Sequence, residues 1–214
     1  EISEASVVGI GSGTTIELLI SQLASTAKSE ALELKLIPTS TQIEAAILKA
    51  GLKITDPNEV SQIDIAVDGA DQVALQTLDL IKGRGAALTR EKIIDAAADR
   101  LIIVVDERKL TKKLGANQPV PVEVIPFAHR FVLSRITKLG GKPSLRYSNE
   151  GGPVVTDNSN FVVDVDFGHI EDAPSLDDRL RSIPGIVETG LFLGMTDRVY
   201  VGLKNGHVQV LQPE

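Results

Sequence analysis

The sequence of 214 residues contains no cysteine and no tryptophan, and aromatic residues make up only 3% of it. Without cysteine the protein can form no disulfide, no thiolate metal site and no cysteine nucleophile. The three histidines, His129, His169 and His207, show no spacing typical of metal ligands or of a His-based triad, so we expect no metal site. Because aromatic residues are scarce, Val, Ile, Leu and Ala must fill the core, which suits buried parallel strands covered by helices.

The sequence also lacks a long apolar run, a basic surplus and a leader-like start. No stretch approaches the roughly 18 apolar residues that span a membrane. The N-terminal residues show no charged region followed by an apolar stretch, so we expect no signal peptide. Lys and Arg number 22 against 29 Asp and Glu, whereas proteins that bind nucleic acid usually carry a basic surplus. We therefore expect a cytoplasmic protein without a membrane or nucleic-acid partner.

Short apolar strands alternate with helical patterns in the first half of the chain. The predicted strands are residues 6–10, 34–37, 63–67 and 101–105, and helical patterns run through residues 16–23, 43–50 and 86–98. Such alternation predicts βαβ units and a parallel sheet.

The pattern changes after residue 119. It predicts a strand at 121–126, a helix at 130–139, a short strand or edge at 145–147, a hairpin of 154–156 with 161–165, a helix at 176–183 and a strand at 186–192. This β-α-β-β-α-β order is the ferredoxin-like arrangement, and a last hairpin pairs 199–203 with 208–211. We predict an α/β protein with a Rossmann-like parallel sheet domain (1–120 plus 196–214) and a smaller ferredoxin-like α+β domain (121–195).

Polar residues gather where the predicted parallel strands end. Residues 12–15, 39–40, 68–71 and 106–109 follow four strands in turn. In an open α/β sheet, ligands bind outside the carboxyl ends of the strands. These segments therefore predict one site for a small molecule.

The first of these segments, Gly11–Thr15, joins a strand to a helix. Glycines let the backbone approach a ligand, and amides at a helix start together with hydroxyl groups attract an anion, so the loop suits one phosphate. An ordinary tight strand–helix turn would have a similar sequence. A dinucleotide is disfavoured, because the second strand ends in Pro38-Thr39 where the dinucleotide fingerprint has an acid.

Two further segments carry charge. Asp68 and Asp71 lie on one tight turn, where paired carboxylates could bind sugar hydroxyls or move protons, although Asp-Gly also marks simple turns. Residues 82–85 (KGRG) form a cationic loop ahead of a helix. That loop could neutralise an oxyanion or a phosphate, and a solvated basic loop would look the same.

Glu91 interrupts an apolar helix face. Ala87, Ile94 and Ala98 form a stripe at helical spacing, and Glu91 lies within it. An acid on a face that should be buried costs free energy unless it is paired or used, which suggests a catalytic base. The alternative is a surface glutamate paired with a neighbouring Arg90 or Lys92.

Together these segments resemble the type A ribose-5-phosphate isomerase family. The matching blocks are residues 9–15 (GIGSGTT), 38–40 (PTS), 68–71 (DGAD), 82–92 (KGRGAALTREK), 121–127 (PVEVIPF), 156–158 (TDN) and 183–192 (IPGIVETGLF). They occur in the family's order and cover nearly the whole chain, so the set is far more specific than any one block.

The resemblance implies an enzyme that interconverts D-ribose 5-phosphate and D-ribulose 5-phosphate through a cis-enediolate, in the non-oxidative branch of the pentose phosphate pathway, without metal or cofactor. By family analogy Glu91 would move the proton between C2 and C1, Lys82 would stabilise the oxyanion and Asp68 would assist ring opening. Asp68 and Lys82 would also bind substrate, together with Ser12, Gly13, Thr14, Thr15, Asp71, Gly83, Arg84, Gly85, Asp106 and Lys109. Family members are usually homodimers or homotetramers, and we expect the same here.

Three features depart from the family pattern. Arg84 stands where the family has a glycine, and Gln72 stands where it commonly has an acid. The N-terminal helix that can supply a phosphate-contacting lysine is absent from this sequence.

Two other functions are compatible with a related fold. A sugar-phosphate-sensing regulatory domain would normally accompany a basic DNA-recognition helix, which the sequence lacks, and it would not need Lys82 with Glu91. A CoA-transferase-like enzyme would use a glutamate as nucleophile toward a thioester, so a covalent adduct with acyl-CoA would identify it.

Overall fold

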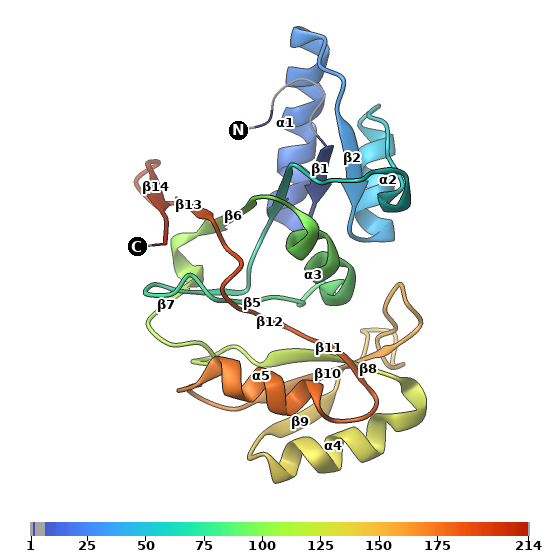
Figure 1. Ribbon diagram of the computed structural model, residues 1–214, viewed down its shortest axis with the longest axis vertical. Coiled ribbons are helices and arrows are strands. Elements are labelled where there is room, and N and C mark those ends of the chain that lie inside the picture. Colours follow the sequence, from blue (N-terminus) through green and yellow to red (C-terminus); the bar gives the residue numbers. More distant parts are fainter. Residues whose placement is uncertain (1, 3–6, 214) are drawn as a thin grey trace. The chain divides into compact units, whose positions relative to one another are not determined.

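The computed structural model describes residue 2 and residues 7–213, and the chain divides into two compact units (Figure 1). The first unit comprises Glu1–Gly69, Arg90–Glu107 and Met195–Glu214, and the second comprises Ala70–Thr89 and Arg108–Gly194. Each unit is therefore assembled from segments that are far apart in the sequence.

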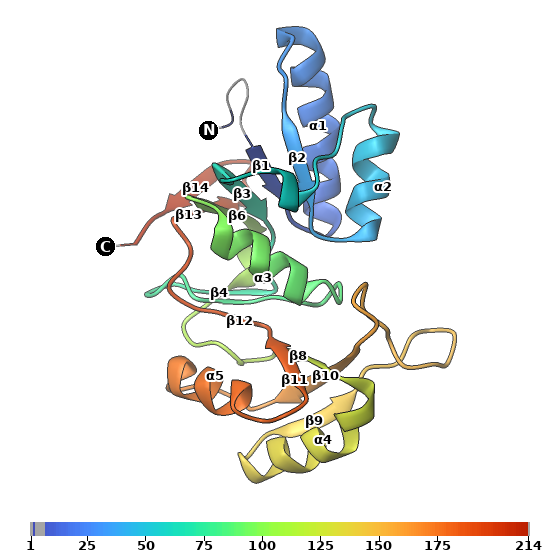
Figure 2. The same ribbon diagram turned by 45° about the vertical axis from the view of Figure 1, so that its right-hand side comes forward.

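Within the described residues, the first unit contains a six-stranded sheet with the order β14-β13-β6-β3-β1-β2 (Figure 2). Its strands are β1 (Val7–Ile10), β2 (Lys35–Pro38), β3 (Ile65–Asp68), β6 (Leu101–Asp106), β13 (Arg198–Gly202) and β14 (Val208–Leu211). The neighbours from β2 to β13 run parallel, and β13 pairs with β14 antiparallel. The predicted parallel arrangement is confirmed for the βαβ part, whereas the C-terminal hairpin makes the sheet mixed.

Two helices cover one face of this sheet. They are α1 (Thr14–Glu30) and α2 (Thr41–Lys49). Successive side chains of a strand point to opposite faces, and Val8 and Ile10 of β1 join one apolar core with Ile16 of α1 and Ile43 of α2. Thr39 and Ser40, which follow β2, are structural: the Ser40 hydroxyl caps α2 by accepting from the Ile43 amide at 3.2 Å.

The helix α3 (Leu88–Ala97) packs on the opposite face of β1. Gly9 lies between Val8 and Ile10, so it faces away from α1 and α2. A Cβ atom at Gly9 would stand only 2.4 Å from Cγ2 of Ile94 in α3. The glycine therefore allows the close approach of helix and strand.

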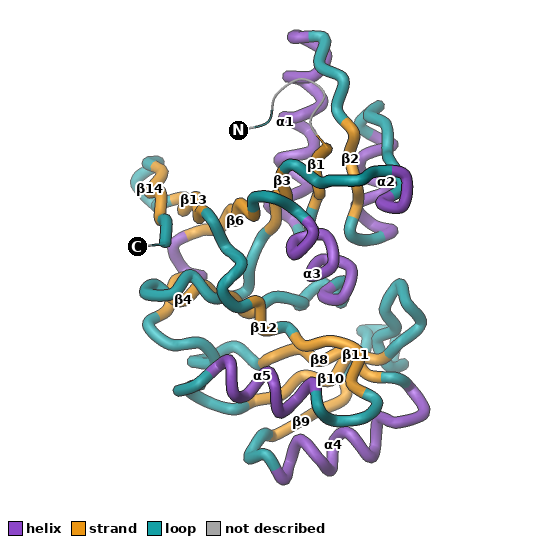
Figure 3. The backbone as a smooth tube through the Cα atoms, in the orientation of Figure 1, coloured by secondary structure: helices purple, strands orange, loops and turns teal. Residues whose placement is uncertain are grey.

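The second unit contains, among the residues described, a four-stranded antiparallel sheet with the order β11-β8-β10-β9. Its strands are β8 (Val120–Val124), β9 (Lys142–Leu145), β10 (Phe161–Asp166) and β11 (Ile186–Thr189), and its helices are α4 (His129–Lys138) and α5 (Ala173–Arg181). Val122 and Val124 share one apolar core with Ile136 of α4 and Leu180 of α5. Both helices therefore cover the same face (Figure 3).

A small sheet in the second unit was not predicted. It has the order β12-β5-β4-β7 and is formed by β4 (Gln72–Ala74), β5 (Leu80–Ile81), β7 (Leu110–Thr111) and β12 (Leu191–Phe192). The prediction of one strand over 186–192 is wrong. β11 and β12 belong to different sheets, and Gly190 separates the two strands. The predicted strand at 154–156 is reduced to a bridge between Val155 and Phe161.

Short 3-10 helices complete the secondary structure at Pro57–Glu59, Glu107–Lys109 and Pro126–Ala128. None of the helices formed by residues 7–213 combines the length and apolar character that a membrane span requires.

Candidate active site

In the first unit, the loop after β1 lies against the end of β3. The Ser12 and Gly69 amides donate to Oδ1 of Asp68 at 3.1 and 2.6 Å. A Cβ atom at Gly11 would stand 1.9 Å from Cγ of Asp68, so only glycine leaves room for this carboxylate. Asp68 is fully buried at the carboxyl end of its strand, where two amides fix one of its oxygens.

The helix α1 begins directly after this loop. Gly13 precedes it with φ 108°, a left-handed conformation that glycine adopts without strain, and no side chain of the described residues caps the helix. Thr14 and Thr15 are exposed. The first amides of a helix lack intrahelical acceptors and carry the positive end of the helix dipole. This helix start can therefore bind an anion.

Glu91 is buried in the first turn of α3, with 3% of its surface exposed. The Ser12 hydroxyl donates a hydrogen bond to Oε1 of Glu91, while the Ser12 amide binds Asp68. The burial predicted from the helical stripe is confirmed. One serine thus links two buried carboxylates beside the start of α1.

Asp106 ends β6, which pairs with β3 in the same parallel sheet. Its side chain is half-buried at the same carboxyl edge that carries Asp68. The first unit therefore brings Ser12–Thr15, Asp68, Glu91 and Asp106 to one edge of its sheet, as the sequence predicted.

The remaining predicted residues lie in the second unit, where Lys82 follows β5. Lys82 is buried, with only 2% of its surface exposed. Its amide donates to the Gly190 carbonyl at 2.9 Å, and its Nζ lies 5.2 Å from the ring centroid of Phe192. Burying an ammonium group costs free energy unless other groups compensate for the lost water. A lysine in this setting is therefore a candidate for a chemical role.

Asp71 organises the loop that follows Lys82. Its Oδ2 accepts from the Arg84 amide at 2.9 Å, and its Oδ1 lies 4.0 Å from Nζ of Lys109. Gly83 has φ 106°, and a Cβ atom there would stand 2.9 Å from the Leu88 side chain. Arg84 and Gly85 are exposed. The two aspartates that the sequence placed on one turn thus belong to different units.

Sequence reasoning missed two charged residues of the second unit, Glu123 and Arg146. Glu123 of β8 is fully buried and accepts from Thr89 at 2.6 Å, and Arg146 pairs with Asp164. Glu123 lies between two valines and looks like a solvent-facing strand residue, while Arg146 lies in no recognisable motif. The only available signal was that Glu123 lies within the 121–127 block.

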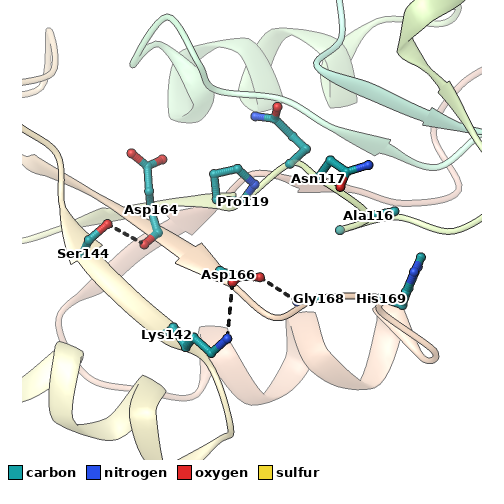
Figure 4. Close-up of a pocket in the computed structure, with 11 residues that line it drawn as sticks. Ala116, Asn117, Pro119, Lys142, Ser144, Asp164, Asp166, Gly168 and His169 are labelled. Carbon is teal, nitrogen blue, oxygen red and sulfur yellow. Dashed lines mark hydrogen bonds and ion pairs between the residues drawn. The ribbon is translucent and has the colours of Figure 1, made fainter.

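A separate hollow of about 560 Å³ lies in the second unit and contains none of the predicted site residues (Figure 4). Its polar groups bind one another: Asp166 accepts from the Gly168 amide at 2.8 Å and pairs with Lys142 at 3.6 Å. Among the described residues, no group of three His, Cys, Asp or Glu side chains could hold a metal ion.

A parallel sheet with buried carboxylates and an open helix start at its carboxyl edge is typical of α/β enzymes that act on small anionic molecules. The profile of the family described as ribose 5-phosphate isomerase A (phosphoriboisomerase A) matches residues 35–206. The ribose-5-phosphate isomerase A of Methanothermobacter thermautotrophicus is 46% identical over 208 residues, which cover 96% of this chain and 90% of the relative.

Solved structures agree with this match. Ribose 5-phosphate isomerase A from Methanocaldococcus jannaschii superposes with a TM-score of 0.94 at 41% identity, over 99% of this chain and 92% of that one. A D-ribose-5-phosphate isomerase in complex with phospho-erythronic acid gives a TM-score of 0.95 at 40% identity, with the same coverage of 99% and 92%. The chain belongs to the ribose 5-phosphate isomerase A family.

Proposed function

We propose that this protein is an aldose–ketose isomerase that interconverts D-ribose 5-phosphate and D-ribulose 5-phosphate in the non-oxidative branch of the pentose phosphate pathway. Its membership of the ribose 5-phosphate isomerase A family supports this activity. The structural observation that carries the proposal is the buried carboxylate of Glu91, which the Ser12 hydroxyl holds beside the start of α1.

In this proposal Glu91 is the base. It takes the proton from C2 of the open-chain aldose, the electron pair forms the C1–C2 double bond, and the carbonyl oxygen on C1 becomes the oxyanion of a cis-enediolate. The hydroxyl proton on O2 passes to O1, and Glu91 returns its proton to C1, which gives the ketose. A positioned general base contributes roughly 10²–10⁴-fold to such a rate.

The other residues bind and polarise the substrate. We assign the phosphate to Ser12–Thr15, because the start of α1 and the exposed hydroxyl groups of Thr14 and Thr15 favour an anion. Asp68 would assist ring opening. In the second unit Lys82 would stabilise the oxyanion and Asp71 would bind sugar hydroxyls.

The remaining predicted residues would line the site. These are Gly83, Arg84, Gly85, Asp106 and Lys109. The exposure of Arg84 leaves its guanidinium available for a substrate contact where the family has glycine. We propose a homodimer or homotetramer in the cytoplasm that needs no cofactor or metal, takes a pentose 5-phosphate and binds neither nucleic acid nor membranes.

We also propose the finer description of the fold. The parallel strands with helices on both faces support a Rossmann-like domain, and the β11-β8-β10-β9 order supports a ferredoxin-like one. As functional domains we propose 1–120 plus 196–214 and 121–195. This division assigns residues 70–89, 108–120 and 195 differently from the compact units.

The test measures ribulose 5-phosphate formation from ribose 5-phosphate by the wild type and by Glu91→Gln. Glutamine keeps the shape and the hydrogen bond to Ser12 but cannot accept the C2 proton, so kcat should fall roughly 10²–10⁴-fold while KM changes far less. In D₂O the wild type should incorporate deuterium at C2 of recovered ribose 5-phosphate, and the variant only at the residual rate.

Glu30→Gln is the matched control, since it makes the same chemical change at the exposed end of α1 in the same unit. It should behave like the wild type. A folded Glu91→Gln protein that isomerises and exchanges normally would move the base elsewhere, with Asp68 the next candidate. A wild type without isomerase activity would refute the proposed function itself.

A further inference from the structure

Two side chains, Asp71 and Arg146, hold the backbone of the loop that follows Lys82. The Asp71 carboxylate accepts from the Arg84 amide at 2.9 Å. Nη1 of Arg146 donates to the carbonyls of both Gly83 and Arg84, each at 3.0 Å. The loop is therefore fixed through its amide on one side and through two carbonyls on the other.

Arg146 is itself held in place. Its Nε donates to Oδ2 of Asp164 at 2.8 Å, and its Nη2 pairs with Oδ1 of the same carboxylate. This two-pronged geometry matches a guanidinium to a carboxylate and fixes the plane of the guanidinium. The side chains of Arg146 and Asp164 are only 16% and 23% exposed, so water competes little for these bonds.

The backbone of Arg146 is anchored as well. Its amide donates to the Val162 carbonyl and its carbonyl accepts from the Val154 amide, both at 2.9 Å. Asp164 lies within β10, where it pairs with Ser144 of β9. A sheet therefore supports the ion pair, and the ion pair supports the loop.

This support matters because Lys82 directly precedes the loop. Its own amide is fixed to the Gly190 carbonyl at 2.9 Å, so the backbone on its C-terminal side is the part that Arg146 controls. Displacing a reacting group by about 1 Å can cost roughly 10²-fold in rate. The bonds from Arg146 thus restrict the backbone that directly follows Lys82.

We propose that Arg146, oriented by Asp164, is a positioning residue that fixes residues 83–85 and thereby aims the ammonium of Lys82. This inference rests on the proposed function for its effect on catalysis. Arg146 touches only the loop carbonyls and Asp164 in this role. Its loss should therefore act through Lys82 and on kcat more than on KM.

The test is a double-mutant cycle between Arg146→Met and Lys82→Met, measured as kcat and KM for ribose 5-phosphate. In the wild-type background Arg146→Met should lower kcat about 10- to 100-fold. In the Lys82→Met background the same change should cost less than about 2-fold, because residues that act as a unit are not additive. Equal losses in both backgrounds would make Arg146 a merely structural residue and overturn the inference.

Two milder variants keep the test informative if Arg146→Met folds poorly. Arg146→Lys retains the charge but cannot bind a carboxylate and two carbonyls in a fixed fork, so it should remain impaired. Asp164→Asn should lower kcat in the same direction by a smaller factor. Normal kcat in both variants would also overturn the inference.

The matched control is Lys142→Met. Lys142 of β9 pairs with Asp166 of β10 at 3.6 Å, so the substitution removes a more exposed ion pair from the same region of the sheet without touching the loop. Its kcat should equal that of the wild type. A loss like that of Arg146→Met would show that any cation on this sheet matters, against the inference.

A second readout does not depend on activity. Arg84 is exposed, so trypsin can cleave after it once the loop opens. Cleavage at Arg84 should be faster in Arg146→Met and Asp164→Asn and unchanged in Lys142→Met. If the wild type proved inactive on ribose 5-phosphate while this difference held, the proposed function would fail and the loop support would stand. Unchanged cleavage would refute the loop support itself.

Discussion

Replacing Glu123 with glutamine should destabilise the protein by about 2 kcal/mol. Four donors converge on this fully buried carboxylate. Thr89 Oγ1 donates to Oε2 at 2.6 Å. Thr156 Oγ1, Asn160 Nδ2 and Asn158 Nδ2 donate to Oε1 at 2.9, 2.8 and 3.3 Å.

The magnitude follows from what glutamine can keep. Its carbonyl can retain the bonds at Oε1, and its NH₂ group replaces Oε2, where the Thr89 hydroxyl must turn from donor to acceptor. Each strong bond changes from charge-assisted to neutral, which loses about 1 kcal/mol, and three bonds are strong. The lower cost of burying a neutral amide offsets part of this loss and leaves about 2 kcal/mol.

Thermal unfolding followed by circular dichroism measures the effect. For a chain of this size, 1 kcal/mol shifts Tm by about 2–4 °C, so Glu123→Gln should lower Tm by about 4–8 °C. Glu123→Met removes this acceptor from all four donors and should lower Tm further. Glu150→Gln, the same change at an exposed position of the second unit, should melt like the wild type. If Glu123→Gln had the same Tm as Glu150→Gln, the reasoning would be refuted.

Two further predictions concern the first unit and the chemistry. Gly11→Ala should lower the free energy of unfolding in urea by about 1–3 kcal/mol, because its Cβ would stand 1.9 Å from Cγ of Asp68. Gly152→Ala, whose Cβ would meet nothing within 4 Å, is the control and should be near neutral; equal stability of both variants would contradict the clash. Isomerase activity should survive exhaustive EDTA treatment, since the sequence has no cysteine and the described part of the chain has no cluster of metal ligands. Loss of activity that a divalent ion restores would contradict this expectation.

The part of the site in the first unit was predictable because it depends on the parallel arrangement of the strands and on the periodicity of one helix. Each parallel strand ends at the same edge of the sheet, so the residues after β1, β3 and β6 had to meet there. Glu91 was visible because helical periodicity is short-range, and an acid within an apolar stripe stands out. Glu91 is buried, in agreement with its place in that stripe.

The small sheet and the interruption between β11 and β12 at Gly190 could not be predicted in the same way. The strands β5 and β12 have two residues each, and they pair across more than a hundred positions of the sequence. Such short segments carry no periodicity, so residues 186–192 looked like one strand. Glycine is required between the two strands because of a residue far away in the sequence: a Cβ atom at Gly190 would stand 2.3 Å from the carbonyl oxygen of Lys82.

Glu123 and Arg146 escaped detection for a related reason. In Val122-Glu123-Val124 the alternation suggests a strand with one solvated face, and only the fold shows that Thr89 and the segment 156–160 cover that face. Arg146 binds backbone carbonyls, which every residue possesses, so its acceptors have no sequence signature.

Residues 121–127 and 156–158 matched the family but had no predicted chemical role. Glu123 of the first block accepts from Thr156 and Asn158 of the second. Glu123 also binds Thr89, two residues before Glu91 in α3. The blocks are therefore best explained as a buried polar network that holds the start of the helix carrying the proposed base.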